Sequence, residues 1–400
     1  MEQVDKKTGL GQRITNFFGL GAGLIVSLFS IRLIVDTSFR MLYPFVPQIS
    51  EGLKVSITVF GWILMIRSAS AFFSPALGSL ADRYGRRKIM TFALLSQFVG
   101  MAGVIFTQGW WAVLPLFFTG LAVNAYLPAQ QAYISDLAPY ERRGRALASI
   151  DIAFAVSGMV LMPVVGWLIN DYGWQMPFWW LSALSLFGAL LTWRYLPEAE
   201  KHTSVVKNIK MRTLLRERNI QASLGVAILL FISVGIFMTF WSIWLSADFS
   251  FDALDLGLIA QGVGLAELLG AILAGLVVDK LGKYRTSFIG LILAAIFFMT
   301  IPLAGENLLL IRILLFITVF WVEYTIVALF PLYGEQAPHA RASMFSLIAL
   351  GNGVGLALGP VITTALWQWR GTSAVTTFAS ISLMLAAILL WLFLRDRKEE

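Results

Sequence analysis

Ionisable side chains inside apolar segments are the residues of this sequence that could do chemistry. Such groups are costly in a membrane, and they usually face a cavity or one another. Arg32, Asp36 and Arg40 are spaced four apart in one segment, so they would share one face of a helix. A buried carboxyl group can bind and release a proton as its surroundings change. Three carboxylates are therefore candidates for proton coupling: Asp36, Glu267 and Glu323.

Depth along the segments predicts which charged groups can meet. Asp36 and Arg67 each lie about ten residues from the outer end of their segments, or roughly 15 Å at the helical rise. We expect the two to pair or to share a water. Asp36 is then either a fixed partner of Arg40 or Arg67, or it alternates between arginine-paired and protonated states. Glu267 and Glu323 have no charged neighbour in their own segments, so each carries a proton or pairs with a cation on another helix.

A further set of residues would line a cavity for a small molecule. Trp241 lies in an aromatic-rich segment and with Trp321 would form an apolar side, although such a stripe more often faces lipid or packs against other helices than lines a binding site. Asn124, Gln130 and Gln131 offer polar contacts from another segment. An amphipathic compound would suit this asymmetry. The predicted cavity residues are Arg40, Arg67, Asn124, Gln131, Asp151, Trp241 and Trp321.

Several classes of chemistry are disfavoured by what the sequence lacks. The chain has no cysteine and only two histidines, so we expect no disulfide, no metal site and no cofactor. It contains no phosphate-binding Gly-x-x-x-x-Gly-Lys-Ser/Thr loop, no His-Glu-x-x-His and no Gly-x-Ser-x-Gly motif. We therefore expect no enzyme and no catalytic residues.

The composition predicts the kind of secondary structure that positions these residues. The chain is 58% hydrophobic and 13% charged over 400 residues, whereas soluble domains contain about 25% charged residues. Only helices or closed barrels satisfy the backbone in lipid. The apolar segments number twelve, as six, a gap and six. The sequence thus predicts an all-α integral membrane protein with two pseudo-symmetric six-helix halves, 1–196 and 221–400. The basic linker 197–220 is either a tether or a helix on the membrane surface.

Basic residues indicate how the chain is oriented. Most of its 30 Lys and Arg residues fall at the termini or on the even-numbered connections, while Asp248, Asp252 and Asp255 fall on the opposite side. Positive charge collects on cytoplasmic loops, so both termini are expected in the cytoplasm. The net charge of +7 then needs no nucleic-acid partner. Absence of an N-x-S/T acceptor agrees with a bacterial inner membrane.

A charged loop motif is repeated at the same place in each half. GSLADRYGRRK (78–88) and GLVVDKLGKYR (275–285) are separated by 197 residues, which indicates duplication and is typical of secondary transporters. Asp82 would lie against the N-terminal end of the eleventh helix, and Asp279 against that of the fifth, where a carboxylate is stabilised. We expect a conformational latch, the alternative being a solvated turn. Its residues are Asp82, Arg83, Arg86 and Asp279.

With these motifs the sequence resembles the major facilitator superfamily over its whole length, and most closely the bacterial twelve-helix multidrug–proton antiporters. The first loop matches the signature of that family. Glycines and prolines in the fifth and eleventh segments match its antiporter signature in part, with Met162 where a glycine is expected. Leu116 stands where those exporters carry an arginine, so that proton-coupling role is not transferred. The implied helix-packing residues are Gly158, Pro163, Gly166, Gly355, Gly359 and Pro360.

The resemblance implies a secondary active transporter that exports small amphipathic compounds in exchange for protons by alternating access. Its partners would be a small-molecule substrate, protons and the lipid bilayer, and we expect a monomer. A facilitator, or a lipid-type or organic-ion transporter of the same fold, remains an alternative, because fold does not fix the substrate. A membrane scaffold is a further alternative, but it would not explain ionisable residues in both halves.

Overall fold

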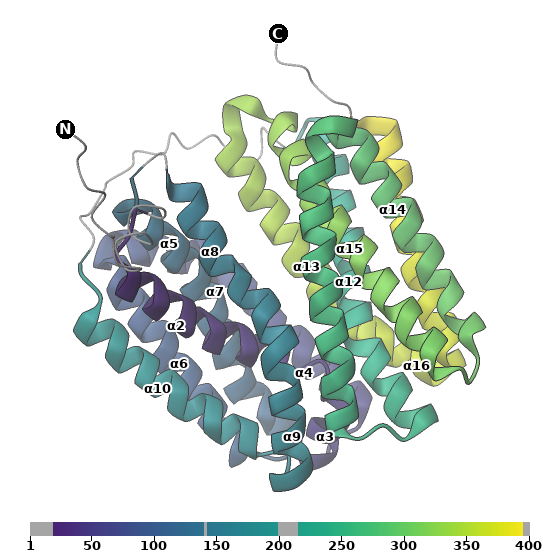
Figure 1. Ribbon diagram of the computed structural model, residues 1–400, viewed down its shortest axis with the longest axis horizontal. Helices are drawn as coiled ribbons and strands as arrows, with labels where there is room; N and C mark the ends of the chain where they lie inside the picture. The colour runs from purple at the N-terminus through teal and green to yellow at the C-terminus, as the bar shows by residue number, and fades with distance from the viewer. Residues whose placement is uncertain (1–18, 140–141, 199–214, 395–400) are drawn as a thin grey trace, which may run out of the picture.

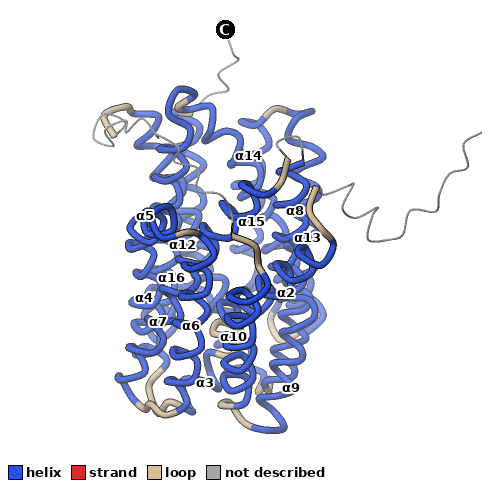
Figure 2. Tube along the Cα trace, turned by 90° about the vertical axis from the view of Figure 1, so that its left-hand side faces the viewer, coloured by secondary structure: helices blue, strands red, loops and turns tan. Residues whose placement is uncertain are grey.

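The computed structural model describes residues 19–139, 142–198 and 215–394, and that part of the chain is helical with short turns and no strands (Figure 2). Within these described residues, eleven apolar helical segments are long enough to cross a membrane. The last of them has 51 residues and is broken by non-helical backbone at Arg370 and Gly371. It therefore makes two crossings, which confirms the predicted twelve.

The first bundle contains six crossings, two of which are interrupted. Ile57–Tyr84 and Arg143–Tyr172 each run through a short irregular turn, with Pro75 and Pro163 in the first turn of the helix that follows. Proline is tolerated there because the N–H it lacks would be unpaired anyway. The helices are α2 (Ala22–Arg40), α3 (Val46–Gly52), α4 (Ile57–Ala69), α5 (Ser74–Tyr84), α6 (Arg86–Ile105), α7 (Val113–Leu137), α8 (Arg143–Val156), α9 (Met162–Tyr172) and α10 (Met176–Tyr195).

The second bundle is built from longer, less interrupted helices. They are α12 (Arg218–Phe249), α13 (Ala253–Leu281), α14 (Lys283–Thr300), α15 (Leu308–Gln336) and α16 (Arg341–Phe393). Side-chain caps fix where two of them start, since Asp252 and Asp255 form a capping box on α13 and Asn307 caps α15.

The backbone conformation of the repeated loop motif explains its glycines. Gly85 and Gly282 stand between α5 and α6 and between α13 and α14, with φ of 100° and 87°. Side chains other than glycine rarely adopt that conformation. Each glycine lets one helix end and the next begin without a longer loop.

The two bundles meet at one end and separate at the other. We call the face where α2 begins and α16 ends the terminal face; it lies at the top of Figure 1, where the bundles diverge. Contacts between the halves join α9 to α13 and α4 to α16. Since α4 and α9 are the parts of their crossings farthest from the terminal face, the structure is closed at the opposite face and open toward the terminal face.

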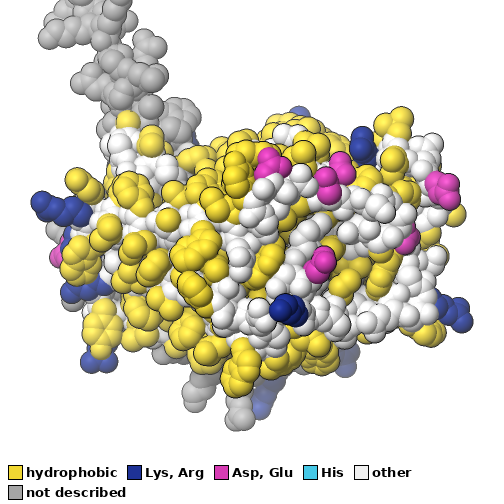
Figure 3. Space-filling view, turned by 90° about the horizontal axis from the view of Figure 1, so that it is seen from below, with side chains coloured by type: hydrophobic (Ala, Val, Ile, Leu, Met, Phe, Trp, Pro, Cys, Tyr) yellow, Lys and Arg dark blue, Asp and Glu magenta, His cyan; other side chains and the backbone are white. Residues whose placement is uncertain are grey.

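The two faces also differ in charge. Exposed acidic residues occupy the opposite face, which Figure 3 views directly: Glu51, Asp171, Asp248, Asp252, Asp255 and Glu306. Exposed basic residues gather at the terminal face: Arg83, Lys88, Arg145, Arg194, Arg216, Arg218, Lys280, Arg285 and Arg341. Of the expected linker 197–220, residues 199–214 lie outside the described part, so the division of the chain there stays a prediction.

Candidate functional site

A cavity between the two bundles consists of two adjoining compartments. An apolar compartment of about 270 Å³ lies mainly against α12, α13 and α15. A polar compartment of about 390 Å³ lies mainly against α2, α4, α7 and α16. Four apolar side chains line both compartments and so form the boundary between them: Phe39, Phe154, Phe231 and Leu356.

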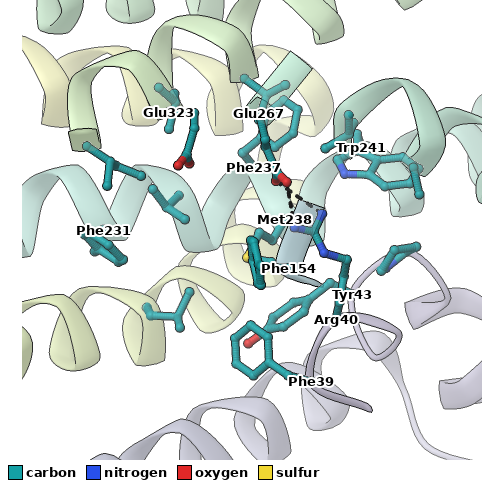
Figure 4. Close-up of a pocket in the computed structure, with 18 residues that line it drawn as sticks. Phe39, Arg40, Tyr43, Phe154, Phe231, Phe237, Met238, Trp241, Glu267 and Glu323 are labelled. Atoms are coloured by element: carbon teal, nitrogen blue, oxygen red, sulfur yellow. Dashed lines mark hydrogen bonds and ion pairs between the residues drawn. The ribbon is translucent and has the colours of Figure 1, made fainter. Parts of the chain in front are cut away.

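In the apolar compartment an ion pair joins the two halves of the chain (Figure 4). Arg40 on α2 donates to both carboxylate oxygens of Glu267 on α13, at 3.2 and 2.6 Å. The guanidinium of Arg40 lies 4.1 Å from the ring centre of Phe154 and is 3% exposed. Gly158 leaves room for it, because a Cβ there would be 2.8 Å from the Nη1 atom of Arg40. Glu267 thus has the cross-helix cation that the sequence left as one of two alternatives.

Glu323 on α15 lines the same compartment. Figure 4 shows its carboxylate pointing into the space that the Glu267 carboxylate also faces. Within the described residues, Glu323 forms no ion pair. Trp241 lines this compartment as expected, but Trp321 does not line it. Its ring packs edge-on against Phe320 and Tyr324, with centroids 5.3 and 5.0 Å away, so it belongs to the helix packing around the site.

In the polar compartment Arg32, rather than Arg67, holds Asp36. The Nε of Arg32 donates to Asp36 at 2.8 Å, and its Nη1 lies 3.2 Å from Asp151 on α8. The expected pairing of Asp36 with Arg67 is therefore absent in this state. The physical reason is local, because Arg32 and Asp36 are one helical turn apart and need no second helix to meet. Asp151 is about half exposed and lies beside this compartment rather than on its wall.

Arg67 lines the polar compartment from α4 and is almost fully buried, at 1% exposure. Its Nε donates to the hydroxyl of Thr119 at 3.0 Å, and its guanidinium lies 5.0 Å from the ring centre of Phe39. On α7, Gly120 permits this approach, since a Cβ there would clash with the backbone carbonyl of Arg67. Leu116 on α7 stands where the similar exporters carry an arginine. In this chain the cation beside that part of α7 is Arg67, which belongs to α4.

The amide side chains of α7 lie in different surroundings. Asn124 lines the polar compartment, whereas Gln131 is exposed and does not line it. Gln130 is the buried one, and its amide donates to the carbonyl of Leu28 at 2.9 Å and to Tyr126 at 3.1 Å. Neighbouring helix positions point about 100° apart, so a shift of one residue decides which glutamine faces inward.

Several wall residues of this cavity were not predicted from the sequence. Asn352 on α16 lines the polar compartment, and a single amide within an apolar run was the signal that could have found it. Phe39 and Phe154 carried no signal, because aromatic residues are frequent throughout these helices.

The loop-motif residues form ion pairs within each half. Arg86 lies 2.8 Å from Asp136 at the end of α7 and 3.7 Å from Asp82. In the second half, Lys283 pairs with Glu335 at the end of α15. Arg83 lies over the ring of Tyr84, while the side chain of Asp82 is 69% exposed and Asp279 is exposed too. With the terminal face open, no ion pair joins Asp82 or Asp279 to the other half within the part of the chain that the structure describes, and the latch stays a prediction for another state.

The residues expected to pack helices together lie at contacts between helices. A Cβ on Gly158 or Gly166 would meet the backbone of α13, and the backbone of Pro163 faces Gly257 on that helix. Gly355 and Gly359 face the backbone of α12. The carbonyl of Pro360 faces Gly61 on α4. The residues from the first half therefore form part of the contact that closes the opposite face.

Comparisons with known proteins agree with this architecture. The chain is 27% identical over 382 residues to the multi-drug resistance efflux pump PmrA homolog of Lactococcus lactis, covering 91% of this chain and 92% of that protein. It is 26% identical over 389 residues to the multidrug resistance protein MdtG of Salmonella typhimurium, covering 91% and 94%. Both relatives match nearly end to end.

Solved structures and a family model give the same result. A D-xylose–proton symporter superposes with a TM-score of 0.77 at 17% identity, covering 93% of this chain and 98% of that one. A bacterial homologue of the human lysosomal transporter Spinster gives 0.73 at 15%, covering 93% and 95%. The family model described as Major Facilitator Superfamily matches residues 28–223 and again 223–400. With the twelve crossings and the duplicated loop motif, these matches show that the chain belongs to the Major Facilitator Superfamily.

Proposed function

We propose that this secondary transporter exports small amphipathic compounds in exchange for protons. The observation that carries the proposal is the cavity between the halves, where the Arg40–Glu267 pair bridges the bundles beside a second carboxylate, Glu323. One wall is apolar and aromatic and the other is polar, which suits an amphipathic molecule. The multidrug resistance names of the relatives support the same substrate class.

The charge distribution supports the orientation of the chain in the membrane. Basic residues gather at the terminal face, and positive charge favours the cytoplasmic side. We place the protein in a bacterial inner membrane with both termini in the cytoplasm. A substrate would then enter the described state from the cytoplasm. We propose that the protein acts as a monomer.

Proton coupling follows from the ion pair. When Glu267 is neutral, the charge attraction that holds Arg40 across the halves is lost. The opposite face is then less firmly closed, and the population moves toward the state open to that face. A proton gradient can drive the cycle only where protonation favours one state over the other, as linkage requires. Asp36 and Glu323 offer two further carboxyl groups for the same coupling.

The test is flux in proteoliposomes with an imposed pH gradient. The probes are dansylate, dansylamide and dansyl-aminoethyl-trimethylammonium, which share one fluorophore and differ in charge. We expect gradient-driven flux of at least one probe, abolished in one or more of Asp36→Asn, Glu267→Gln and Glu323→Gln. Asp171→Asn on the opposite face is the matched control and should transport normally. Gradient-driven flux retained by all three cavity variants would favour a facilitator, and absence of any flux would favour a scaffold.

A further inference from the structure

Arg67 is a buried cation without a carboxylate. It is 1% exposed, its Nε is bound by the Thr119 hydroxyl, and its Nη2 has no hydrogen-bond partner among the described residues. The carboxylate in its compartment, Asp36, is already held by Arg32 at 2.8 Å. Asp151, the next carboxylate along, is also bound to Arg32. The compartment therefore leaves one guanidinium without a contacting anion.

Other polar groups lie around Arg67. The Ser68 and Tyr43 hydroxyls are buried beside it, and Tyr43 contacts both Ser68 and the guanidinium. The side-chain oxygen of Asn352, which lines the same compartment, is buried without a hydrogen-bond partner among the described residues. A hydroxyl cannot neutralise the guanidinium. Buried polar groups are normally hydrogen-bonded, and a buried cation without a counter-charge is strongly unfavourable. The guanidinium therefore fits a ligand that supplies the missing anion, with the Ser68 hydroxyl as a further donor, whereas the Asn352 oxygen only accepts and would take a donor elsewhere on the ligand.

We propose that the polar compartment binds the anionic headgroup of an amphipathic acid, with the headgroup oxygens on Arg67. The headgroup class is carboxylate, sulfonate or phosphate, which a guanidinium fork recognises with two donors. The uncharged body of the ligand extends past Phe39 and Phe231 into the apolar compartment. The reverse placement is disfavoured, because the unpaired carboxylate of Glu323 lies in that second compartment.

This proposal deepens the proposed function by naming the substrate class, and it rests on the same cavity. The polar compartment should bind organic anions more tightly than organic cations, for a physical reason. An organic cation placed in the polar compartment would meet the guanidinium at close range in a poorly solvated space, where like charges repel strongly. A neutral amide of equal shape would keep the hydrogen bonds but leave the charge of Arg67 uncompensated.

The test is binding of the three dansyl probes to the purified chain, followed by probe fluorescence. We expect dansylate to bind at least tenfold more tightly than dansylamide, a difference of about 1.4 kcal/mol, and the trimethylammonium probe to bind most weakly. Arg67→Gln should weaken dansylate binding at least tenfold and dansylamide binding by less, because only dansylate loses a charge interaction, so the preference for the anion should disappear. Arg67→Lys keeps the charge and should retain a preference for the anion.

Arg312→Gln is the matched control, since this arginine lies four residues into α15 and lines neither compartment. It should keep the wild-type preference. Equal affinities of the wild-type chain for dansylate and dansylamide would overturn the proposal, whether or not Arg67→Gln folds. An anion preference that survives Arg67→Gln would overturn it too. If a pH gradient drives flux but the chain shows no preference for the anion, only this inference is contradicted. If binding depends on Arg67 but no probe is transported, only the proposed function is contradicted.

Discussion

The Arg40 guanidinium depends on one carboxylate, and that carboxylate belongs to the other half of the chain. Glu267→Gln should therefore leave a charge that is 3% exposed without a counter-ion. Breaking one side of a buried pair costs about 3–5 kcal/mol. We expect a clear loss of stability, measured as a lower midpoint of thermal unfolding in detergent.

Two further variants separate the charge effect from loss of shape. Arg40→Gln combined with Glu267→Gln should be less harmful than the sum of the single changes, because it removes both charges. Glu323→Gln breaks no ion pair within the described residues and should lower the midpoint little. Additive losses in the double variant, or an equal loss in Glu323→Gln, would contradict the assignment of Arg40 and Glu267 as a stabilising pair.

At the level of elements, α13 packs against the α8–α9 crossing through glycines. A Cβ on Gly264 would lie 2.8 Å from the Met159 nitrogen, whereas one on Gly262 would meet nothing within 4 Å. Gly264→Ala should therefore destabilise by about 1–3 kcal/mol through overpacking. Gly262→Ala on the same helix should be neutral or stabilising by up to about 1 kcal/mol, because alanine favours helix. Thermal unfolding of the two variants side by side checks this, and equal midpoints would contradict the close approach.

The same elements show what could be predicted from sequence. Apolar runs and the 197-residue repeat predict the twelve crossings, because membrane thickness and backbone hydrogen bonding leave few alternatives. Contacts between distant residues were not predictable. Arg40 and Glu267 are 227 residues apart, and nothing local indicates that they meet. The rotation of a helix about its axis was not predictable either. Gln131 was expected to face inward but is exposed, while Gln130 is buried, and Trp321 does not line the cavity.

For the whole molecule, alternating access requires the terminal face to close when the opposite face opens. In the open state the side chain of Asp82 is 69% exposed, and its ion pair among the described residues is with Arg86 of its own half, at 3.7 Å. A carboxylate at the N-terminal end of a helix contributes about 0.3–1 kcal/mol. If Asp82 reaches α16 only when the terminal face closes, Asp82→Asn should lower the closed population several-fold without reducing thermal stability.

The native chain has no cysteine, so paired spin labels can report this equilibrium without background. Ser79→Cys on α5 and Leu281→Cys on α13 are exposed near the terminal face in opposite halves. Their distance distribution in nanodiscs should contain a short component from the closed state, and Asp82→Asn should diminish it. Asp171→Asn on the opposite face carries the same loss of charge and should leave that component unchanged. A short component equally populated with and without Asp82 would show that the loop motif fixes topology alone, because a latch must stabilise one state over the other.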